Sequence, residues 1–454
     1  MKGIFIFRKD LRIYDNNGLN KLLELCDEVY CLFIYDDQQL NSKYISYNSL
    51  YYLSECVKQL NKQLDNKLTI MNGTIKQVLE YIIKSFNHKI DYIGYNNDFT
   101  VYSLERDVLI NKLCFNNNIQ TVSNDSDQTL IDMKYLLKED KNIYISFSGF
   151  YNNHNKKIKK NYINTNDLTK IKKMNINSYS LDQTYINKKS KSLKHIPINR
   201  DDVIEIIYKY KETDDNLISD SSLLSTALNF GVVSIREAWK LSKNIRRNLV
   251  WRSYYLCIMR YNPISKQSLF VDMKYNRVKW PKINDKHWDK FINSQTGFLI
   301  IDAIYIELKN TGYINNRARL LLATFWIKYL LINPYDQKYG SIIGYSNLLV
   351  DCCTSQNNYN HEWVLGSLDL SGRRFSKKGT NSLTGRMIRI DNEMIKKYDK
   401  DCIYIKKWLP KLSNIPNKEL INWDKKYDIS IHPAPIFNWK EQYERYCSMF
   451  TNLQ

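Results

Sequence analysis

Hydrophobic and polar residues alternate in two ways over residues 1 to 125. Short runs rich in β-branched and aromatic residues predict strands at Gly3 to Phe7, Glu28 to Tyr35, Leu68 to Met71, Tyr92 to Tyr95 and Thr121 to Ser123. Between them, apolar residues recur at helical spacing, as in the sets Leu50, Leu53, Val57, Leu60 and Val101, Leu104, Val108, Leu109. Strands that alternate with helices predict a doubly wound α/β domain with a parallel sheet.

The regular spacing of hydrophobic residues is lost after residue 131 and returns, as a helical pattern, after residue 200. From about Asp132 to Arg200 the chain is rich in Asn, Lys and Ser, which predicts an interdomain linker over the surface. The lysines of this segment either contact DNA or are simply solvated. After Arg200 the pattern is helical. We therefore predict an α/β domain at residues 1–130, a linker at 131–200 and a larger all-α domain at 201–454.

The stretch from Gly312 to Trp363 sets polar residues between apolar segments. An apolar helix is predicted from Arg317 to Ile332, and Asn316, Arg317 and Arg319 stand at its start, where free backbone N–H groups can hold an anion or a polar ring. Farther along lie Asp351, Asn357, Asn358, His361 and Trp363. Such a cluster serves either a buried ligand or a structural network, and the stretch alone does not decide between them.

Two other segments carry candidate chemistry. Asp220-Ser221-Ser222-Leu223-Leu224-Ser225 places hydroxyls ahead of a helix, which suits a phosphate but is also the usual sequence of a helix cap. Asn248, Trp251 and Arg252 share one helical face. An aromatic ring with an arginine can stack on a base and grip a phosphate, although a buried Trp beside a surface Arg is the simpler interpretation.

Charge and composition narrow the class of partner. The net charge of +20 over 454 residues favours a polyanion such as nucleic acid, unless a general bias toward Lys, Asn, Ile and Tyr is the cause. All nine tryptophans follow residue 238, so the two halves of the chain are expected to have different functions.

Several classes of protein are disfavoured. The N-terminus reads as a strand rather than a secretory signal, and the longest apolar run, Leu320 to Ile332, contains Lys328 and is too short to span a bilayer. The nine cysteines are scattered without a CxxC pair, which predicts reduced, mostly buried thiols and an intracellular, soluble protein. The sequence has no HExxH, GxGxxG or GxxxxGK[ST] motif, so we expect no catalytic metal and no standard nucleotide loop.

Taken together, these pieces resemble the photolyase/cryptochrome family almost from end to end. Phe7-Arg8-Lys9-Asp10-Leu11-Arg12, followed by Asp15-Asn16, is similar to the family's opening F-R-x-D-L-R-x-x-D-N. The helical half follows the family's order with Ser222-Leu223-Leu224-Ser225, Phe230-Gly231, Trp251-Arg252, Thr296-Gly297, Ile301-Asp302-Ala303, Thr311-Gly312, Asn316-Arg317, Arg319, Asp351, Asn357 and Trp408-Leu409-Pro410. Each motif is weak alone, but the ordered set is strong.

The resemblance implies FAD bound in a U shape within the helical domain, and light-driven electron donation to a pyrimidine dimer flipped out of DNA. The cofactor contacts that it implies are Tyr210, Ser221, Ser222, Leu223, Leu224, Ser225, Arg319, Asp351, Cys353 and Asn357. Arg319 and Asp351 would form a paired charge beside the isoalloxazine, and Asn357 would face flavin N5. An amide there favours the reduced cofactor, whereas the plant cryptochrome pattern has Asp.

The DNA-contacting residues that the resemblance implies are Asn248, Trp251, Arg252, Asn316, Arg317 and Trp363. Trp251 and Trp363 would flank the dimer. The (6-4) branch of the family has histidines beside its substrate, and Tyr313-Ile314-Asn315-Asn316-Arg317 has none, so a cyclobutane dimer is the expected lesion.

Some positions depart from the family pattern. Asn248 replaces a Glu that contacts the dimer, and Cys353 replaces the second acid beside the flavin. Of the three tryptophans that usually carry an electron to the flavin, His361 occupies the inner position and Pro334 the middle one, with only Trp280 near the outer one. We therefore predict another route through Trp326 and tyrosines such as Tyr329 and Tyr335.

The antenna is open as well, because Asn96 to Ser103 lacks the Asn-Glu pair associated with folate. A deazaflavin, a flavin, a folate in another pose, or no second chromophore remain alternatives. The leading hypothesis is a monomeric, flavin-dependent photolyase acting on cyclobutane pyrimidine dimers in UV-damaged DNA. The alternatives are a cryptochrome-type photoreceptor without repair activity, and a light-independent flavoprotein or DNA-binding protein.

Overall fold

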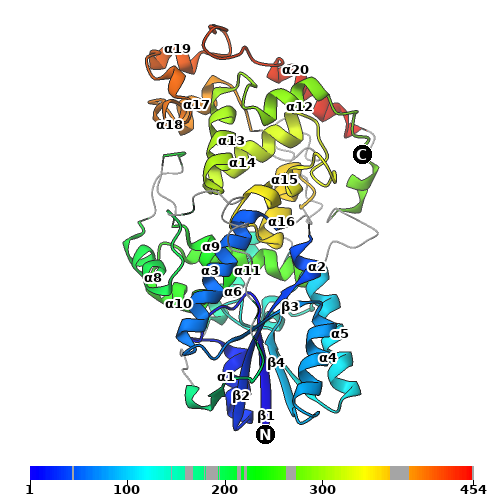
Figure 1. The fold of residues 1–454 in the computed structure, drawn as a ribbon. Helices are drawn as coiled ribbons and strands as arrows, with labels where there is room; N and C mark the ends of the chain where they lie inside the picture. Colours follow the sequence, from blue (N-terminus) through cyan, green and yellow to red (C-terminus); the bar gives the residue numbers. More distant parts are fainter. Residues whose placement is uncertain are drawn as a thin grey trace.

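The computed structural model describes residues 1–42, 45–144, 146–158, 167–177, 179, 193, 195–211, 216–218, 222–261, 272–368 and 388–451. The molecule is elongated, with a parallel sheet and the N-terminus at one end and a helical lobe at the other (Figure 1). The two predicted fold classes, α/β followed by all-α, are thereby confirmed.

The sheet is doubly wound. Its strands are β1 (Lys2–Phe7), β2 (Glu28–Asp36), β3 (Thr69–Gly73), β4 (Tyr92–Asn96) and β5 (Gln120–Asn124), in the order β3-β2-β1-β4-β5, with every pair parallel. All five predicted strands are confirmed to within two residues at each end. Side chains of a strand alternate between faces, so Phe5 and Phe7 pack on one side of the sheet and Ile4 and Ile6 on the other.

Helices cover both faces of this sheet (Figure 1). The connecting helices are α1 (Asn17–Leu25), α2 (Asp37–Leu40), α3 (Tyr47–Gln63), α4 (Ile75–Ser85) and α5 (Val101–Asn116). Helices α1 and α3 share a core with Phe5 and Phe7, whereas α4 and α5 pack against Ile4 and Ile6. Crossover helices on opposite faces give the doubly wound arrangement that the sequence predicted.

Helix α5 has the predicted position but not the predicted inner face. Val101 and Val108, which belong to the set of apolar residues at helical spacing, are exposed, and Asp107 is buried instead. Asp107 turns inward because its carboxylate pairs with Arg8 at 2.8 Å, so an ion pair takes a place on the inner side of the helix. Hydrophobic spacing cannot reveal such a pair.

The predicted linker is more ordered than its composition indicated. Its described part contains η1 (Met133–Leu136), α6 (Phe147–Lys157), η2 (Leu168–Lys170) and β6 (Ile171–Lys172). Strand β6 adds to the sheet beside β2, and Phe147 and Phe150 of α6 pack against the helical half. The described residues of this segment therefore contribute to the core rather than only covering the surface.

The helical half begins beside the sheet and ends in the far lobe (Figure 1). Its elements are α8 (Arg200–Lys209), α9 (Leu224–Phe230), α10 (Ile235–Leu241), α11 (Arg246–Tyr261), η3 (Met273–Arg277), α12 (Asp285–Ile292), α13 (Leu299–Thr311), α14 (Asn316–Thr324), η4 (Phe325–Tyr329), α15 (Ser341–Leu348), α16 (Thr354–Leu365), α17 (Asn392–Tyr398), α18 (Ile403–Trp408), η6 (Pro410–Leu412), α19 (Asn417–Ile421) and α20 (Trp439–Ser448). Helices α8 to α10 share one hydrophobic core with α1 and α3, so a core spans the predicted domain boundary at residue 200.

The long helix predicted from Arg317 to Ile332 is interrupted. Helix α14 ends at Thr324, the segment η4 is a π-helical turn, and Leu331 adopts a left-handed conformation at φ +56°. A π turn leaves carbonyl groups without their α-helical partners. Gln442 of α20 satisfies one of them by donating to the Tyr329 carbonyl at 2.7 Å. The turn sets the direction in which Trp326 enters the core.

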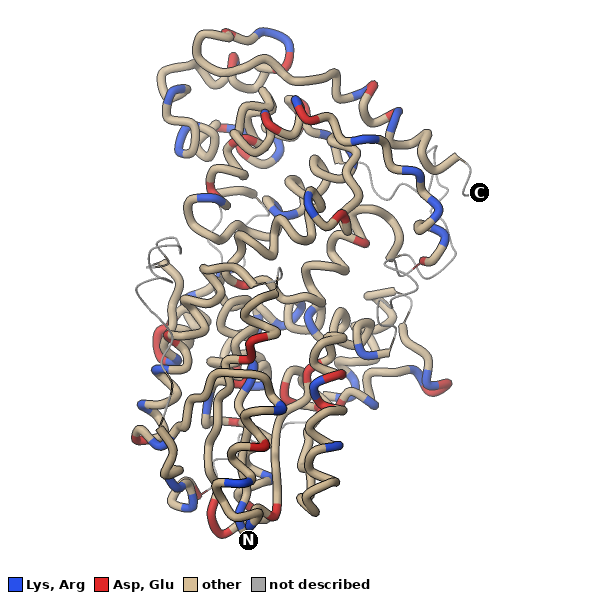
Figure 2. The backbone as a smooth tube through the Cα atoms, turned by 45° about the vertical axis from the view of Figure 1, so that its right-hand side comes forward, with Lys and Arg blue, Asp and Glu red and all other residues tan. Residues whose placement is uncertain are grey.

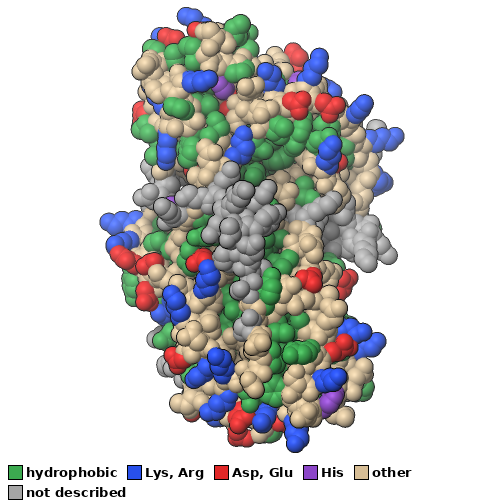
Figure 3. Space-filling model, in the orientation of Figure 1, with side chains coloured by type: hydrophobic (Ala, Val, Ile, Leu, Met, Phe, Trp, Pro, Cys, Tyr) green, Lys and Arg blue, Asp and Glu red, His purple; other side chains and the backbone are tan. Residues whose placement is uncertain are grey.

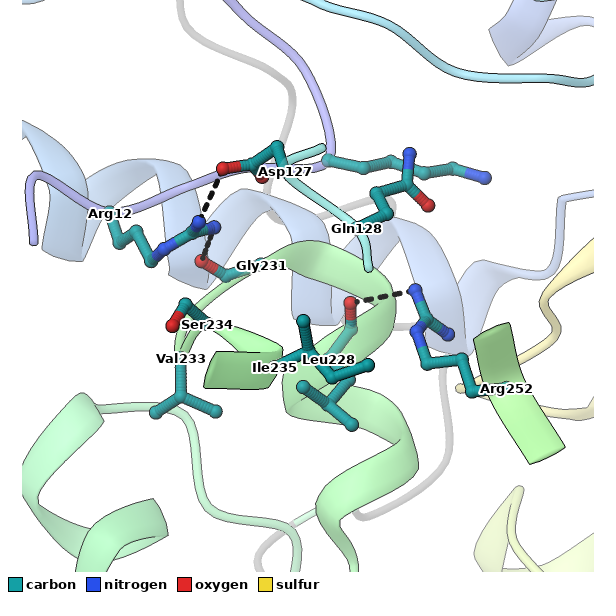
Figure 4. A pocket seen from close by; sticks show the side chains of 10 residues that line it. Arg12, Asp127, Gln128, Leu228, Gly231, Val233, Ser234, Ile235 and Arg252 are labelled. Atoms are coloured by element: carbon teal, nitrogen blue, oxygen red, sulfur yellow. Dashed lines mark hydrogen bonds and ion pairs between the residues drawn. The ribbon is translucent and has the colours of Figure 1, made fainter. Parts of the chain in front are cut away.

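Buried ion pairs and hydrogen bonds hold the N-terminal motif in place and join it to the helical half. Arg12 pairs with Asp127 at 2.6 Å and donates to the Gly231 carbonyl at 3.2 Å (Figure 4). Asp15 accepts from Arg236 Nε at 2.8 Å. Gly231 lies at φ +72°, and a Cβ there would come within 2.2 Å of the Lys9 carbonyl, so only glycine allows this close approach. The motif at Phe7 to Asn16 therefore acts largely as an interdomain clamp.

The cysteines and the lengths of the helices bear on two further predictions. All nine cysteines are free thiols, and most of them are buried, as predicted. No helix among the described residues has both the length and the apolar character needed to cross a bilayer.

Candidate functional site

Arg319 and Asp351 form a buried ion pair at the centre of the helical half. Arg319 Nη2 lies 3.0 and 2.8 Å from the two carboxylate oxygens of Asp351, and its Nε donates to the Ile314 carbonyl at 2.9 Å. Asp351 is 1% exposed and Arg319 24% exposed. Burial alone would lower the pKa of the guanidinium, but the Asp351 carboxylate raises it above its ordinary value. The pair is therefore fully charged and fixed, with Nη1 making no hydrogen bond among the described residues.

Hydrogen bonds to helix α15 hold the Asn357 side chain in one orientation. Its Nδ2 donates to the Ile342 carbonyl at 3.1 Å and lies 3.5 Å from Ser346 Oγ, both on α15. Because these contacts engage the amide nitrogen, the oxygen Oδ1 is left as an acceptor, and it has no partner in the described part of the chain. Arg319 on α14 thus provides a donor, and Asn357 on α16 provides an acceptor.

Arg252 is turned inward rather than toward the surface, where DNA contact was expected. It is buried, and its guanidinium donates to the Leu228 carbonyl at 3.2 Å and to Gln356 Oε1 at 3.4 Å. Its Nη1 lies 3.9 Å from the Cys353 sulfur. Burial raises the pKa of the Cys353 thiol, but the cations of Arg252 and Lys9 together hold it below its ordinary value.

The predicted phosphate segment is only partly described. Ser221 lies outside the described residues. Leu223 is left-handed at φ +50° and precedes α9 without a side-chain cap, Leu224 is buried and Ser225 is exposed. Ser222 is half-buried, and Tyr210 follows α8, where its carbonyl accepts from Asn244 at 3.1 Å.

The residues predicted to contact DNA lie on three helices. Asn248 is exposed on α11, Asn316 is exposed at the start of α14, and Trp363 on α16 is 36% exposed. Helices α11 and α16 are joined by the Tyr255 hydroxyl, which donates to Asn360 Oδ1 at 3.2 Å. Arg317 instead places its guanidinium 4.9 Å from the centre of the Tyr398 ring, so part of its charge serves an internal contact.

Trp251 has a partner that sequence reasoning missed. Its indole stacks on Phe147 with ring centres 3.5 Å apart and planes 4° from parallel. Arg247 lies 5.2 Å from the centre of the Phe147 ring. Phe147 was overlooked because it falls in the predicted linker, although Ser146 ahead of Phe147 and Phe150 is a recognisable helix start.

The residues at the usual electron-transfer positions are buried and differ from tryptophan. His361 donates through Nδ1 to the Asn357 carbonyl at 2.7 Å, while its Nε2 has no hydrogen-bond partner among the described residues. Its ring lies 5.0 Å from the Tyr345 ring. Pro334 is buried, and its carbonyl accepts from Ile342 N at 3.2 Å. The described structure thus places no indole at either position.

Burial gives His361 a testable pH dependence. Desolvation lowers the pKa of His361 from 6.5 to about 4, so the unfolded chain binds a proton in this range while the folded chain does not. Stability should therefore fall as pH decreases from 6.5 to 4, by roughly 3 kcal/mol in total from this group. Urea unfolding at a series of pH values should show a shallower acid loss in His361→Phe.

The matched variant for this test is His154→Phe, because His154 is also buried with a pKa lowered to about 4, but lies on α6 away from Asn357. It should flatten the acid loss by a similar amount. If His361→Phe unfolds with the same pH dependence as the unchanged protein, His361 is not a buried neutral group.

The residues present fit FAD. Gln356 Nε2, Thr226 Oγ1 and Asn229 Oδ1 are buried without hydrogen-bond partners in the described structure. Helix α16 begins without a side-chain cap, beside the Arg252 guanidinium, so its first N–H groups can serve an anion. Unpaired polar atoms this deep are costly unless a polar molecule meets them. A ligand with phosphates, hydroxyls and a hydrogen-bonding ring, as FAD has, satisfies that demand.

The net charge of +20 favoured a polyanionic partner, so the positions of the charged residues are relevant. Lys and Arg are spread along the whole chain (Figure 2). On the face in Figure 3 they are scattered over both ends and mixed with Asp and Glu. That face therefore has no concentrated basic patch among its described residues.

Known proteins are similar to this chain in sequence and in fold. A family described as "DNA photolyase" matches residues 4–169, and one described as "FAD binding domain of DNA photolyase" matches residues 245–452. The deoxyribodipyrimidine photo-lyase of Buchnera aphidicola subsp. Acyrthosiphon pisum is 26% identical, with 99% of this chain and 96% of that protein covered.

Solved structures of photolyases and cryptochromes have the same fold as this chain. The archaeal photolyase from Sulfolobus tokodaii, solved with two FAD molecules, aligns with a TM-score of 0.80 at 26% identity over 100% of both chains. The Synechocystis sp. PCC6803 cryptochrome aligns with a TM-score of 0.81 at 18% identity over 99% of both chains, which shows a shared fold.

Proposed function

Because the chain belongs to the photolyase/cryptochrome family and FAD is its cofactor, we propose that it is a deoxyribodipyrimidine photo-lyase that repairs cyclobutane pyrimidine dimers in UV-damaged DNA. Reduced FAD supplies an electron when it absorbs near-UV or blue light. The protein's part is to bind and orient the cofactor and the flipped dimer, to exclude water and to set the electrostatics.

The orientation of Asn357 is the observation that carries this proposal. Its nitrogen is engaged by the Ile342 carbonyl, so its neutral oxygen would be left to accept a hydrogen bond from a protonated flavin nitrogen. A carboxylate in its place would repel the reduced cofactor, which carries a negative charge. Two like charges about 4 Å apart cost about 4 kcal/mol at an effective dielectric constant of 20. The neutral amide therefore supports a reduced resting state, which light-driven repair requires.

The other residues divide between the cofactor and DNA. Arg319, fixed by Asp351, offers its free Nη1 edge to the flavin, and Arg252 with the start of α16 supports its phosphates. Asn248, Asn316 and Trp363 are exposed and would face the lesion strand. Phe147 covers one face of Trp251, so a pyrimidine that stacks on this indole either takes its other face or displaces Phe147.

Blue light in the presence of a dimer-containing oligonucleotide tests the proposal. The purified protein with reduced FAD should restore thymines in light and not in darkness. Asn357→Asp should reduce repair by at least about tenfold, because a loss of only 1.4 kcal/mol already has that effect. Asn357→Gln, which keeps the amide, is the control for the change in charge.

The cryptochrome alternative rests on a specific replacement. Asn248 can donate a hydrogen bond but cannot give up a proton, unlike the Glu it replaces, so in this alternative the site binds a dimer without splitting it. Binding of dimer DNA in light with no restored thymine would support this alternative and would overturn the repair proposal. Restoration in darkness would instead indicate chemistry that does not depend on light.

A further inference from the structure

A line of aromatic rings runs from the candidate flavin site through the core to a half-buried tryptophan. Its members are Tyr345 on α15, Trp326 in the π turn η4 and Trp288 on α12. The ring centres of Tyr345 and Trp326 lie 6.2 Å apart, and those of Trp326 and Trp288 lie 5.7 Å apart. At such separations the edges of neighbouring rings are in contact.

The inner end of this line touches the residues assigned to the flavin. The Tyr345 hydroxyl donates to the Arg319 carbonyl at 2.7 Å, and the Tyr345 ring lies 5.0 Å from His361. His361 in turn contacts the Asn357 carbonyl at 2.7 Å. Tyr345 thus contacts the backbone of Arg319 directly and is linked to Asn357 through His361.

The outer end reaches the surface. Trp326 is 2% exposed, whereas Trp288 is only half-buried. Trp288 also contacts the ring of Tyr339, with centres 5.0 Å apart. A solute at the surface can thus reach Trp288 but not Trp326.

The chain is built to hold Trp326 in this place. Its Nε1 donates to the Tyr339 carbonyl at 2.8 Å, which fixes the plane of the indole. On α15, a Cβ at Gly344 would lie 2.3 Å from Trp326 Cη2, so the absence of a side chain there makes room for the ring. A glycine inside a helix is normally unfavourable, and this contact accounts for it.

We propose that Tyr345, Trp326 and Trp288 conduct electrons from the surface to the bound flavin, in place of the family positions that His361 and Pro334 occupy here. The inference rests on FAD as the cofactor and adds to the proposed function the way in which the oxidised enzyme is made active. It also replaces part of the sequence prediction. Tyr329 stacks on Phe325 and Phe437, and the Tyr335 hydroxyl donates to Glu362, so neither tyrosine joins the line.

One electron leaves Trp326 for the photoexcited, oxidised cofactor, and one electron from Trp288 refills Trp326. A second such transfer, together with one proton from water, completes the two-electron reduction of the cofactor. Oxidised Trp288 gives its Nε1 proton to water, because it is partly exposed. A thiol from solution then returns one electron and one proton to Trp288 and is itself oxidised, and two such thiols pair as a disulfide.

The hydrogen bonds determine which rings carry the charge. The Tyr345 hydroxyl donates to a backbone carbonyl, which is too weak a base to take its proton, and burial raises the pKa of that hydroxyl above its ordinary value. Tyr345 therefore serves as a bridge and is not itself oxidised. Trp326 also donates to a carbonyl, so it keeps its proton and passes the charge on. Only Trp288 can release a proton to water and so trap the separated charge.

Photoreduction of the full-length protein with oxidised FAD tests this route. The protein is illuminated with blue light in dithiothreitol, and reduction is followed by the absorbance of the bound flavin. Trp326→Phe and Trp288→Phe should each slow reduction by at least about tenfold, which equals about 1.4 kcal/mol in activation free energy. Flash spectroscopy should detect a deprotonated tryptophan radical in the unchanged protein and none in Trp288→Phe.

Trp280→Phe is the matched control. Trp280 is also half-buried and stands nearest the family's outer position, but it makes no ring contact among the described residues. It should reduce its flavin at the unchanged rate. Reduction at that rate in both Trp326→Phe and Trp288→Phe would overturn the proposal, as would a slow Trp280→Phe beside a normal Trp288→Phe.

Two further measurements separate the possible failures. The bound-flavin spectrum reports whether each variant folds. If Trp326→Phe binds no FAD, the photoreduction rate of the surface variant Trp288→Phe is used to test the route instead. Reducing the unchanged protein with dithionite in darkness and then assaying repair tests the proposed function without the electron route. Normal photoreduction with no repair after dithionite would refute the repair activity and leave the route standing.

Discussion

Replacing Arg236 by alanine is expected to lower the free energy of unfolding by roughly 3–5 kcal/mol, because it leaves a buried carboxylate without its cation. Arg236 Nε donates to Asp15 Oδ2 at 2.8 Å, and the two side chains are 6% and 3% exposed. The same guanidinium donates to the carbonyls of Ser126 at 2.6 Å and Thr129 at 3.2 Å. It also donates to the Asp15 carbonyl at 2.9 Å, so one side chain satisfies an acid and three backbone carbonyls between the two halves of the molecule.

Urea unfolding followed by circular dichroism measures this effect. The control is Lys209→Ala, which removes an exposed ion pair with Glu205 on α8 and should cost no more than about 0.5 kcal/mol. Adding Asp15→Asn to Arg236→Ala should recover part of the loss, since the unpaired charge is then gone. A loss below about 1 kcal/mol in Arg236→Ala would mean that the clamp contributes little to stability.

This clamp shows what the sequence could and could not reveal. Phe7 to Asn16 identified the family, but the motif gives no sign that Arg12 and Asp15 reach Asp127 and Arg236, which are distant in sequence. Strands were predictable because each is a short apolar run between turns. The inner face of α5 was not, because Asp107 is buried by its pairing with Arg8 rather than by hydrophobicity.

The candidate site divides in the same way. The pairing of Arg319 with Asp351 followed from the resemblance, and the structure has it at hydrogen-bonding distance. The inward turn of Arg252 depends on Leu228 and Gln356 on two other helices, which spacing along α11 cannot show. The order Tyr345, Trp326, Trp288 likewise arises only when α12, η4 and α15 pack together.

Replacing Arg319 by alanine should have a comparably large effect, this time at the flavin. The substitution leaves Asp351, which is 1% exposed, without its only close cation among the described residues, at a cost of roughly 3–5 kcal/mol near neutral pH. It also removes the Nη1 donor beside the cofactor, so the purified variant should contain little or no FAD. Absorbance of bound flavin and urea unfolding with and without added FAD measure the two effects.

Asp351→Asn is the matched control, because it leaves Arg319 charged but still 24% exposed and able to meet water. It should cost less than Arg319→Ala, and the double variant should be more stable than the two single losses added together, by about 0.5–3 kcal/mol. Strictly additive losses would show that the two side chains do not stabilise each other. If Arg319→Ala retains FAD at the unchanged level, the guanidinium is structural only, and the flavin ring must be held by other residues.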